Sequence, residues 1–409
     1  MPRLPMSLSG LSIRAKLFSV VVVATIPTAV LLLALLRHQN QDISIAQQEQ
    51  AGARYVVALQ RLQVHAGSHR DAAAAFLGGD IQAQDRLNRE TGEVDNALRL
   101  AADAEKKVGR SFKTGPMLNQ IRQDWDGIKT RGNNVTAKQS LDDHTKLIVG
   151  DLVPLIYQVG ARSKLLLDPE ANGYHLAVSI SAYVPLVADA LSQLQAEVAR
   201  LVSAGGQGGA ALTLASEDRV RLYALLGDLS VNEESTQREL KAAGAADRAI
   251  AQKLSAQAAA AEVSTATYVA SLETNILKTA TLGGDAAAMH AQADAAITGY
   301  TDLTVNATQT LNRVLQQRVD QNDSGRLLSF VVTGLGLGLA ALLILVVVQN
   351  VTGRLVHLAS VADRISLGEL EAEIDTRGSD EVSRLAAAFQ RMQASLTAAI
   401  ERLRARRAS

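Results

Sequence analysis

The sequence predicts an all-α protein: two transmembrane helices, a long extracytoplasmic helical bundle between them and a cytoplasmic parallel coiled coil. Aromatic residues are only 3% of the 409 residues, whereas sheets rely on aromatic and β-branched side chains. Helix-forming Ala, Leu and Gln are abundant instead. No proline, the strongest helix breaker, follows Pro185. Two long segments carry no charge, and these predict the membrane helices.

The composition excludes several classes of protein. Lys and Arg number 41, as do Asp and Glu, so the chain lacks the basic excess typical of nucleic-acid binders. Cysteine is absent, which excludes disulfides, cysteine-ligated metals and a cysteine nucleophile. We therefore expect no nucleic-acid partner, no metal and no cofactor.

The first apolar segment, 17–36, has 20 uncharged residues, which span about 30 Å as a helix. A cleaved signal peptide is the alternative interpretation, because the residues before it are basic. A signal peptide usually has an apolar core of only about 7–15 residues. The length therefore favours an uncleaved transmembrane helix.

The second apolar segment, 327–353, has 27 uncharged residues and also predicts a span. Residues 1–16 carry three positive charges and no acid, so the positive-inside rule places them in the cytoplasm. Two spans then put 37–326 outside a bacterial inner membrane and return the tail to the cytoplasm. The three glycines of 334–338 allow close helix packing, although ordinary membrane composition explains them equally well.

Glycine-rich turns divide 37–326 into amphipathic helices. We expect the first helix to run from the first span to about Leu77, and the last to run from about Asp285 into the second span. The helices must pack as a bundle, predicted as two stacked modules at about 37–167 and 168–326. The expected turns and breaks are 78–80, 111–116, 132–136, 205–209 and 283–285.

Between the two modules, Asp168-Pro169-Glu170 is typical of a helix start. Asp168 can be the N-cap, Pro169 suits the first helical position, and Glu170 suits the positive end of the helix dipole. The same run superficially resembles a calcium loop. Its twelfth position is Ser179, so the bidentate glutamate is missing and a helix start is favoured.

The run SKLLLDPEANGYHLA, preceded by DHTKLIVGDLVPLIYQVG, resembles the helical sensory region of bacterial transmembrane receptors. These are the methyl-accepting chemotaxis proteins and the sensor histidine kinases. Ser68-His69-Arg70, near the end of the first long helix, is similar to that pattern as well. The resemblance implies that 37–326 detects a stimulus outside the cell.

The tail, 354–405 followed by 406–409, contains two amphipathic helices separated by a connector. The second has an apolar seam with heptad-like spacing, so two copies could complete a parallel four-helix coiled coil. The residues VADRISLGELEAEI and SDEVSRLAAAFQRMQASL resemble a HAMP domain. The apolar positions are Leu355, Leu358, Ala362 and Ile365 in the first helix, and Val382, Leu385, Phe389, Met392, Leu396 and Leu403 in the second.

The HAMP resemblance implies a role for five residues: Gly368 ends the first helix, Leu370 and Ile374 dock onto the bundle, and Asp380 and Glu381 open the second helix. Two positions depart from the pattern. Arg354 stands where the family usually has proline, and Ser383 stands where it often has glycine. The missing proline predicts that the second span continues directly into the first HAMP helix.

Signatures of catalysis are absent: the sequence has no nucleophile elbow and no P-loop. We expect no enzymatic activity and interpret His357 as structural. Arg54, Arg61 and Arg70 are the candidates for ligand binding, on the expectation that they lie along one side of the first long helix. Surface charge is the simpler interpretation of these three arginines.

These patterns predict a homodimeric, chemotaxis-receptor-like signal transducer in the bacterial inner membrane. It would sense a small ligand or a periplasmic protein and relay the signal through its HAMP domain. Two alternatives stay open. One is a non-enzymatic adaptor that regulates a separate cytoplasmic partner. The other is the input half of a histidine kinase or cyclase whose output domain is missing.

Overall fold

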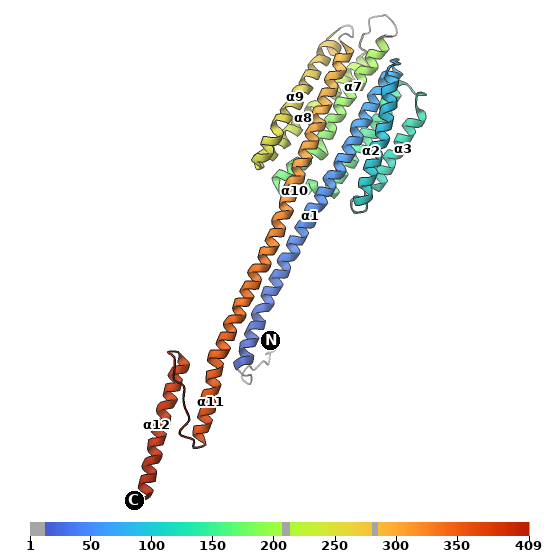
Figure 1. Ribbon diagram of the computed structural model, residues 1–409. Coiled ribbons are helices and arrows are strands. Elements are labelled where there is room, and N and C mark those ends of the chain that lie inside the picture. Colours follow the sequence, from blue (N-terminus) through green and yellow to red (C-terminus); the bar gives the residue numbers. More distant parts are fainter. Residues whose placement is uncertain (1–12, 207–212, 280–284, 409) are drawn as a thin grey trace, which may run out of the picture. The chain divides into compact units, whose positions relative to one another are not determined.

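The computed structural model describes residues 13–206, 213–279 and 285–408, and every regular element in these ranges is a helix (Figure 1). The predicted all-α class is therefore confirmed. The chain forms two compact units, one of Gln41–Asn322 and one of Met1–Asn40 with Asp323–Ser409. Two long helices, α1 (Ile13–Leu77) and α10 (Ala286–Val347), contribute residues to both units.

The first half of the Gln41–Asn322 unit packs around the distal part of α1. Its breaks fall where glycine and proline predict them, and Thr136 forms a capping box with Gln139 at the start of α4. A buried apolar core runs from Tyr55 to Val159. The elements are α2 (Ala83–Phe112), α3 (Gly115–Arg131), α4 (Ala137–Thr145), the π-helix η2 (Lys146–Leu152) and α5 (Val153–Arg162).

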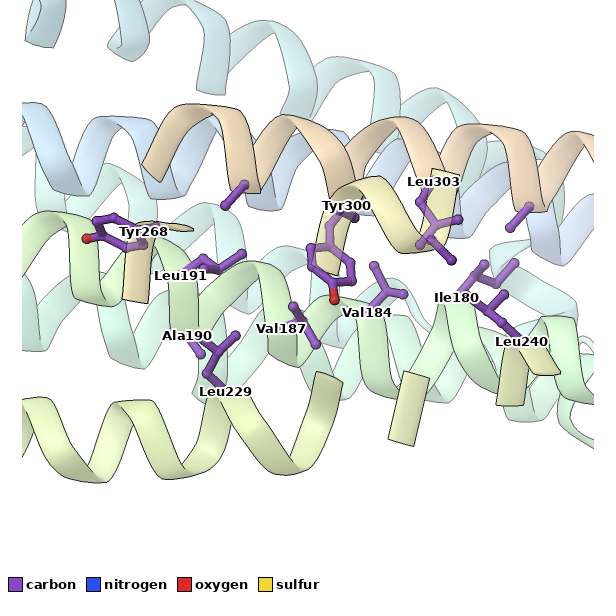
Figure 2. Packing of buried hydrophobic residues seen from close by; sticks show 14 of the residues in the cluster. Ile180, Val184, Val187, Ala190, Leu191, Leu229, Leu240, Tyr268, Tyr300 and Leu303 are labelled. Carbon is purple, nitrogen blue, oxygen red and sulfur yellow. The ribbon is translucent and has the colours of Figure 1, made fainter. Parts of the chain in front are cut away.

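The second half forms its own core, from Leu165 to Leu315, which α10 completes. Figure 2 shows Tyr300 and Leu303 of α10 among Val184, Val187 and Leu191. The predicted turns at 205–209 and 283–285 lie largely outside the described residues. The elements are η3 (Leu165–Leu167), α6 (Ala171–Val178), the π-helix η4 (Ser179–Tyr183), α7 (Val184–Gly206), α8 (Ser216–Ala246), α9 (Arg248–Leu272) and the π-helix η5 (Glu273–Leu277).

The two halves pack laterally, because α1 and the η4–α7 helix run parallel and in contact. Gln60 bonds to Ile180, Arg70 pairs with Asp189, and Ala74 packs with Ala196. Residue numbers rise together along both helices, which shows the parallel direction. The two predicted modules therefore share α1 along its length and are not joined end to end.

The helix expected to begin at Asp168 begins later. α6 starts at Ala171, and its N-cap is Glu170. Asp168 accepts the backbone N–H of Glu170 at 2.8 Å and forms an ion pair with Arg318 at 3.0 Å. The carboxylate is thus used in a tertiary contact instead of a cap. An alanine at position 173 would displace this carboxylate, because its Cβ would lie 2.0 Å from Asp168 Oδ2.

Two helical stretches among the described residues are long and apolar enough to cross a membrane. One, Ala171–Ser203, has 67% of its apolar window buried and is a core helix of the bundle. The other, Ala286–Ser366, contains the predicted second span, and its apolar window is not buried at all. In the predicted first span, described side chains such as Phe18 and Leu31 are about 70% exposed. The predicted second span therefore coincides with a helical stretch that could cross a membrane, whereas the predicted first span is not one of the two stretches.

The tail continues directly from α10. A single π-helical turn, η6 (Val348–Thr352), joins α10 to α11 (Gly353–Ser366), and α12 (Glu381–Ala408) follows after a connector. The chain is therefore helical from Ala286 to Ser366, as the absence of proline at Arg354 predicts. The extra residue in the π-turn rotates the faces that follow it relative to those that precede it.

Candidate functional site

Gly368 ends α11 in a left-handed conformation, with φ at +98°. The N–H of the next residue, Glu369, bonds to the carbonyl of Arg364 at 3.0 Å, and Gly368 N–H bonds to Ile365 O at 3.1 Å. This is the C-cap pattern that favours glycine at the position after the helix. The position implied for Gly368 by the HAMP resemblance therefore has a direct conformational reason.

The connector docks onto α11 through its apolar side chains. Leu370 and Ile374 pack against a small core of Val361, Ile365 and Ala372. Gln393 of α12 donates to the carbonyls of Leu370 and Ala372 at 2.8 and 2.9 Å. The extended connector is thus held from both sides, by apolar contact with α11 and by hydrogen bonds from α12.

Asp380 caps α12 and also binds an arginine from the start of α11. Its Oδ1 accepts the backbone N–H of Ser383 at 2.8 Å, which is N-cap geometry. Arg354 Nη1 lies 3.2 Å from Asp380 Oδ2, and Arg354 Nη2 donates to Ser383 Oγ at 2.8 Å. Arg354 also donates to the carbonyl of Arg377. Glu381 is exposed at the first helical position, where an acid suits the helix dipole.

The three arginines expected along one side of α1 do not share a side, and this expectation was wrong. Arg54 and Arg61 are exposed, whereas Arg70 is fully buried and pairs with Asp189 at 3.0 Å. The reason is the helical repeat: nine residues at about 100° each turn Arg70 to the face opposite Arg61. Arg70 holds α1 to α7, and its Nε and Nη1 atoms have no hydrogen-bond partner.

A cavity of about 370 Å³ lies where α1, the start of α7 and α10 meet. Its wall is mainly apolar, and it includes the exposed Arg61 and the half-buried His65. Two buried glutamines of α1 form its inner edge, with Gln60 donating to Ile180 O and Gln63 to Pro185 O, each at 2.6 Å. Its size suits a small ligand. Arg61 is the one of the three arginines that lines this cavity.

Two buried histidines form a hydrogen-bonded pair between α1 and α4. His69 Nδ1 lies 2.7 Å from His144 Nε2, and His144 Nδ1 lies 2.6 Å from the carbonyl of Ser140. The carbonyl accepts from His144 Nδ1, so His69 Nδ1 must be the donor to His144 Nε2. Burial lowers the pKa of His144 to about 4, and burial with the neighbouring ring lowers the pKa of His69 well below its usual value. Both rings are neutral at pH 7.

A charged cluster joins α1, α2 and α10 near the start of α10. His290 lies between Asp71 (2.9 Å) and Asp294 (3.2 Å), and Arg86 pairs with Asp71 at 3.1 Å. Hydrogen bonds to Asp294 and Asp71 raise the pKa of His290 to about 9. Arg86 Nη1 also lies 2.7 Å from His290 Nε2, so the cluster brings two basic side chains and two carboxylates together.

Several of these contacts have no signal in the sequence. His65 and His69 are four residues apart on α1, a spacing at which two histidines of one helix could share a metal. In the structure the two separate, since His65 binds Glu90 at 3.1 Å and His69 turns inward. No group of three or more metal-ligating side chains occurs in the described part of the chain. Pro185 has no N–H, so it leaves a carbonyl of the preceding helical turn, such as Ile180 O, without its usual donor; this accounts for the Gln60 bond but not for the Gln63 bond to Pro185 O.

A helical stretch long and apolar enough to cross a membrane and a connector docked between two helices are typical of membrane-anchored signalling proteins. Residues 346–398 match the HAMP domain family. The matched segment begins eight residues before the predicted start at 354 and ends seven residues before the predicted end at 405. HAMP domains relay signals in sensor kinases, chemoreceptors and cyclases, and they occur in dimeric membrane proteins. The chain is therefore a HAMP-containing signal transducer.

Two further comparisons complete the picture. No curated protein sequence matches the chain at a significant level. The solved structure titled "Structure of the NasR transcription antiterminator" aligns over 94% of this chain and 99% of that chain, with 14% identity and a TM-score of 0.46.

Proposed function

We propose that this protein is a two-span, homodimeric receptor of a bacterial inner membrane, chemotaxis-receptor-like in its organisation. Its bundle of Gln41–Asn322 detects an extracytoplasmic small ligand or protein, and its HAMP domain relays the result to a cytoplasmic output. The protein itself performs no catalysis. The output lies in a further domain or in a separate cytoplasmic partner.

One observation carries this proposal. Each of α1 and α10 is a single helix that includes bundle residues and an apolar segment, and α10 leads through one π-turn into the HAMP helix α11. A continuous helix is stiff, so a shift at one end is transmitted along its axis. HAMP helices then change their packing between alternatives, as a two-state element must.

The topology is tested with single cysteines, because the native chain has none. Thr130 on α3 and Ser395 on α12 are both exposed and are each replaced by cysteine. A membrane-impermeant maleimide should label the Thr130→Cys variant in cells with a permeabilised outer membrane. It should label the Ser395→Cys variant only after the inner membrane is broken. Equal labelling of both in unbroken cells would refute the two-span receptor.

The dimer is tested on α12, where Leu385, Met392 and Leu396 are 41–45% exposed in the single chain. These side chains form the seam that a second copy would cover. A Met392→Cys variant should form an interchain disulfide in membranes. The matched Arg391→Cys variant, one residue away on the exposed side, should form little. Equal crosslinking at both positions would argue against the parallel dimer.

The alternatives are separated by the size of the protein in its own cells, detected with an antibody against 37–326. A band near 43 kDa would favour the adaptor, whose partner a pull-down with the HAMP tail should identify. A band larger by about one domain would favour a receptor, kinase or cyclase with its output on the same chain.

A further inference from the structure

Two fully buried carboxylates meet one arginine where α1, the segment before α6 and α10 come together. Glu49 Oε2 lies 3.4 Å from Arg318 Nη1, and Asp168 Oδ1 lies 3.0 Å from Arg318 Nη2. The side chains of both acids are 0% exposed. Glu49 belongs to α1 and Arg318 to α10, so the arginine joins the two helices that lead to the predicted spans.

The charges at this junction do not balance if every group is ionised. The buried groups then comprise two negative carboxylates and one guanidinium, leaving one uncompensated negative charge. Two further charged groups face the junction: Glu170, which is half exposed and 3.0 Å from Arg318 Nε, and the exposed Lys164. Burying an unpaired charge is costly, and one bound proton removes the excess.

The contacts indicate which carboxyl holds the proton. Asp168 is well supported as an anion, because it accepts the backbone N–H of Glu170 and two contacts from Arg318. Glu49 has only the 3.4 Å contact, and its buried Oε1 has no hydrogen-bond partner. Burial and the nearby Asp168 raise the pKa of Glu49 to about 8. Burial raises the pKa of Asp168 as well, but the arginine and the backbone bond oppose this.

Close packing keeps water and mobile counterions from replacing that proton. A Cβ on Gly52 of α1 would lie 2.1 Å from Ser163 Oγ. Because Ser163 caps the end of α5, α1 and that helix end are in direct contact here. On the other side, Gln50 Nε2 donates to Gln316 Oε1 at 3.1 Å, between α1 and α10. The junction therefore has little room to relax when its charge changes.

We propose that Glu49, with Asp168 and Arg318, forms a proton-binding site that controls how tightly α1 and α10 are joined. With the proton bound, the junction is neutral and the helices are held together. When the proton is lost, the two carboxylates of Glu49 and Asp168 repel each other, and the contact between α1 and α10 loosens. The use of this site to sense extracytoplasmic acidity rests on the proposed receptor function, whereas the protonation itself does not.

The bound proton is measured directly by infrared pH-difference spectroscopy of the full chain in nanodiscs. The C=O stretch of a protonated carboxyl should persist at neutral pH, disappear with a midpoint near pH 8, and be absent from the Glu49→Gln variant. Glutamine has the same shape as the protonated acid, so the variant is expected to fold. A band unchanged by Glu49→Gln, or one lost by pH 6, would overturn the proposal.

Two control variants define the electrostatic cause. Glu170→Gln removes a neighbouring negative charge and should lower the midpoint without abolishing the band. Glu262→Gln alters an exposed acid on α9 and should leave the midpoint unchanged. If Glu170→Gln left the midpoint unchanged while Glu262→Gln moved it, the band would not belong to this junction.

The mechanical consequence is measured with nitroxide labels on the exposed Gln47 of α1 and Gln317 of α10, after each is changed to cysteine. The distance distribution should broaden or lengthen between pH 6 and pH 9 in the parent chain and stay constant in Glu49→Gln. A constant distance in the parent would remove the coupling. The cysteine-labelling test of topology is independent, so failure of the receptor proposal would be recognised separately.

Discussion

Arg354 donates to Ser383 Oγ at 2.8 Å, and these are the two positions at which the tail departs from the HAMP pattern. The two departures therefore compensate each other. A proline at 354 could make no such bond, and a glycine at 383 could accept none. The Ser383 hydroxyl also donates within the turn before α12, so the pair ties the start of α11 to the start of α12.

Removing this arginine should loosen the start of α12. In the Arg354→Ala variant, Asp380 and the carbonyl of Arg377 lose their shared donor, and the cap on Ser383 N–H is less firmly held. We expect faster amide exchange at Ser383 and Arg384, measured by hydrogen exchange and mass spectrometry on the full chain. The matched Arg391→Ala variant removes an exposed arginine and should leave these amides unchanged. Identical protection in both variants would contradict the role of Arg354.

Gly368 should be intolerant of any side chain although there is open space around it. No atom lies within 4 Å of a Cβ built there, so the cost is purely conformational. At φ +98° an alanine should cost about 1–2 kcal/mol, which corresponds to local exchange at the end of α11 that is faster by about fivefold or more. Gly353→Ala is the control, because it has open space and an ordinary helical φ. An equal effect of both substitutions would refute the conformational explanation.

The sequence allowed the fold to be predicted wherever a single local signal decides the structure. Gly368, the breaks near Pro116 and Gly132, and the capping role of Asp380 each follow from the conformation or charge of one residue. The uncharged segments 17–36 and 327–353 are likewise recognised from their own residues alone. These features do not depend on which distant helix becomes a neighbour.

The tertiary contacts of the Gln41–Asn322 unit could not be predicted because they join residues far apart in the chain. Asp168 suited an N-cap, yet Arg318, 150 positions later, binds it instead. The burial of Arg70 depends on the half-turn that separates it from Arg61 and on α7 packing against that face of α1. The partner carbonyls of Gln60 and Gln63 depend on the π-helix η4 and Pro185, and hydrophobic periodicity does not reveal them.

The buried Arg70–Asp189 pair should be important to stability. Arg70→Met leaves Asp189 buried without its cation, and loss of one partner of a buried pair costs about 3–5 kcal/mol. The melting temperature of the full chain in detergent should fall clearly, whereas Arg61→Met, at an exposed site, should change little. Adding Asp189→Leu to Arg70→Met should recover much of the loss, because no unpaired charge remains. Without such recovery, the arginine would act through packing alone.

The His69–His144 pair should make the bundle weaken in acid, with a sign opposite to that at Glu49. The folded pKa of His144 is lowered to about 4, so the folded state binds fewer protons than the unfolded chain between about pH 4 and 6.5. The contribution to stability is complete above pH 6.5 and is lost as the pH falls toward 4.

For Glu49 the raised pKa, about 8, makes its contribution complete below about pH 4.5 and lost as the pH rises through 8. Denaturant unfolding of the full chain should separate the two groups. Relative to the parent, a His144→Gln variant should flatten the dependence of the unfolding free energy on pH from 6.5 to 5. Glu49→Gln should remove the fall in that free energy from pH 6.5 to 8, above the range of His144. If either variant kept the parental slope in its own range, the buried group concerned would be ionised in the folded state.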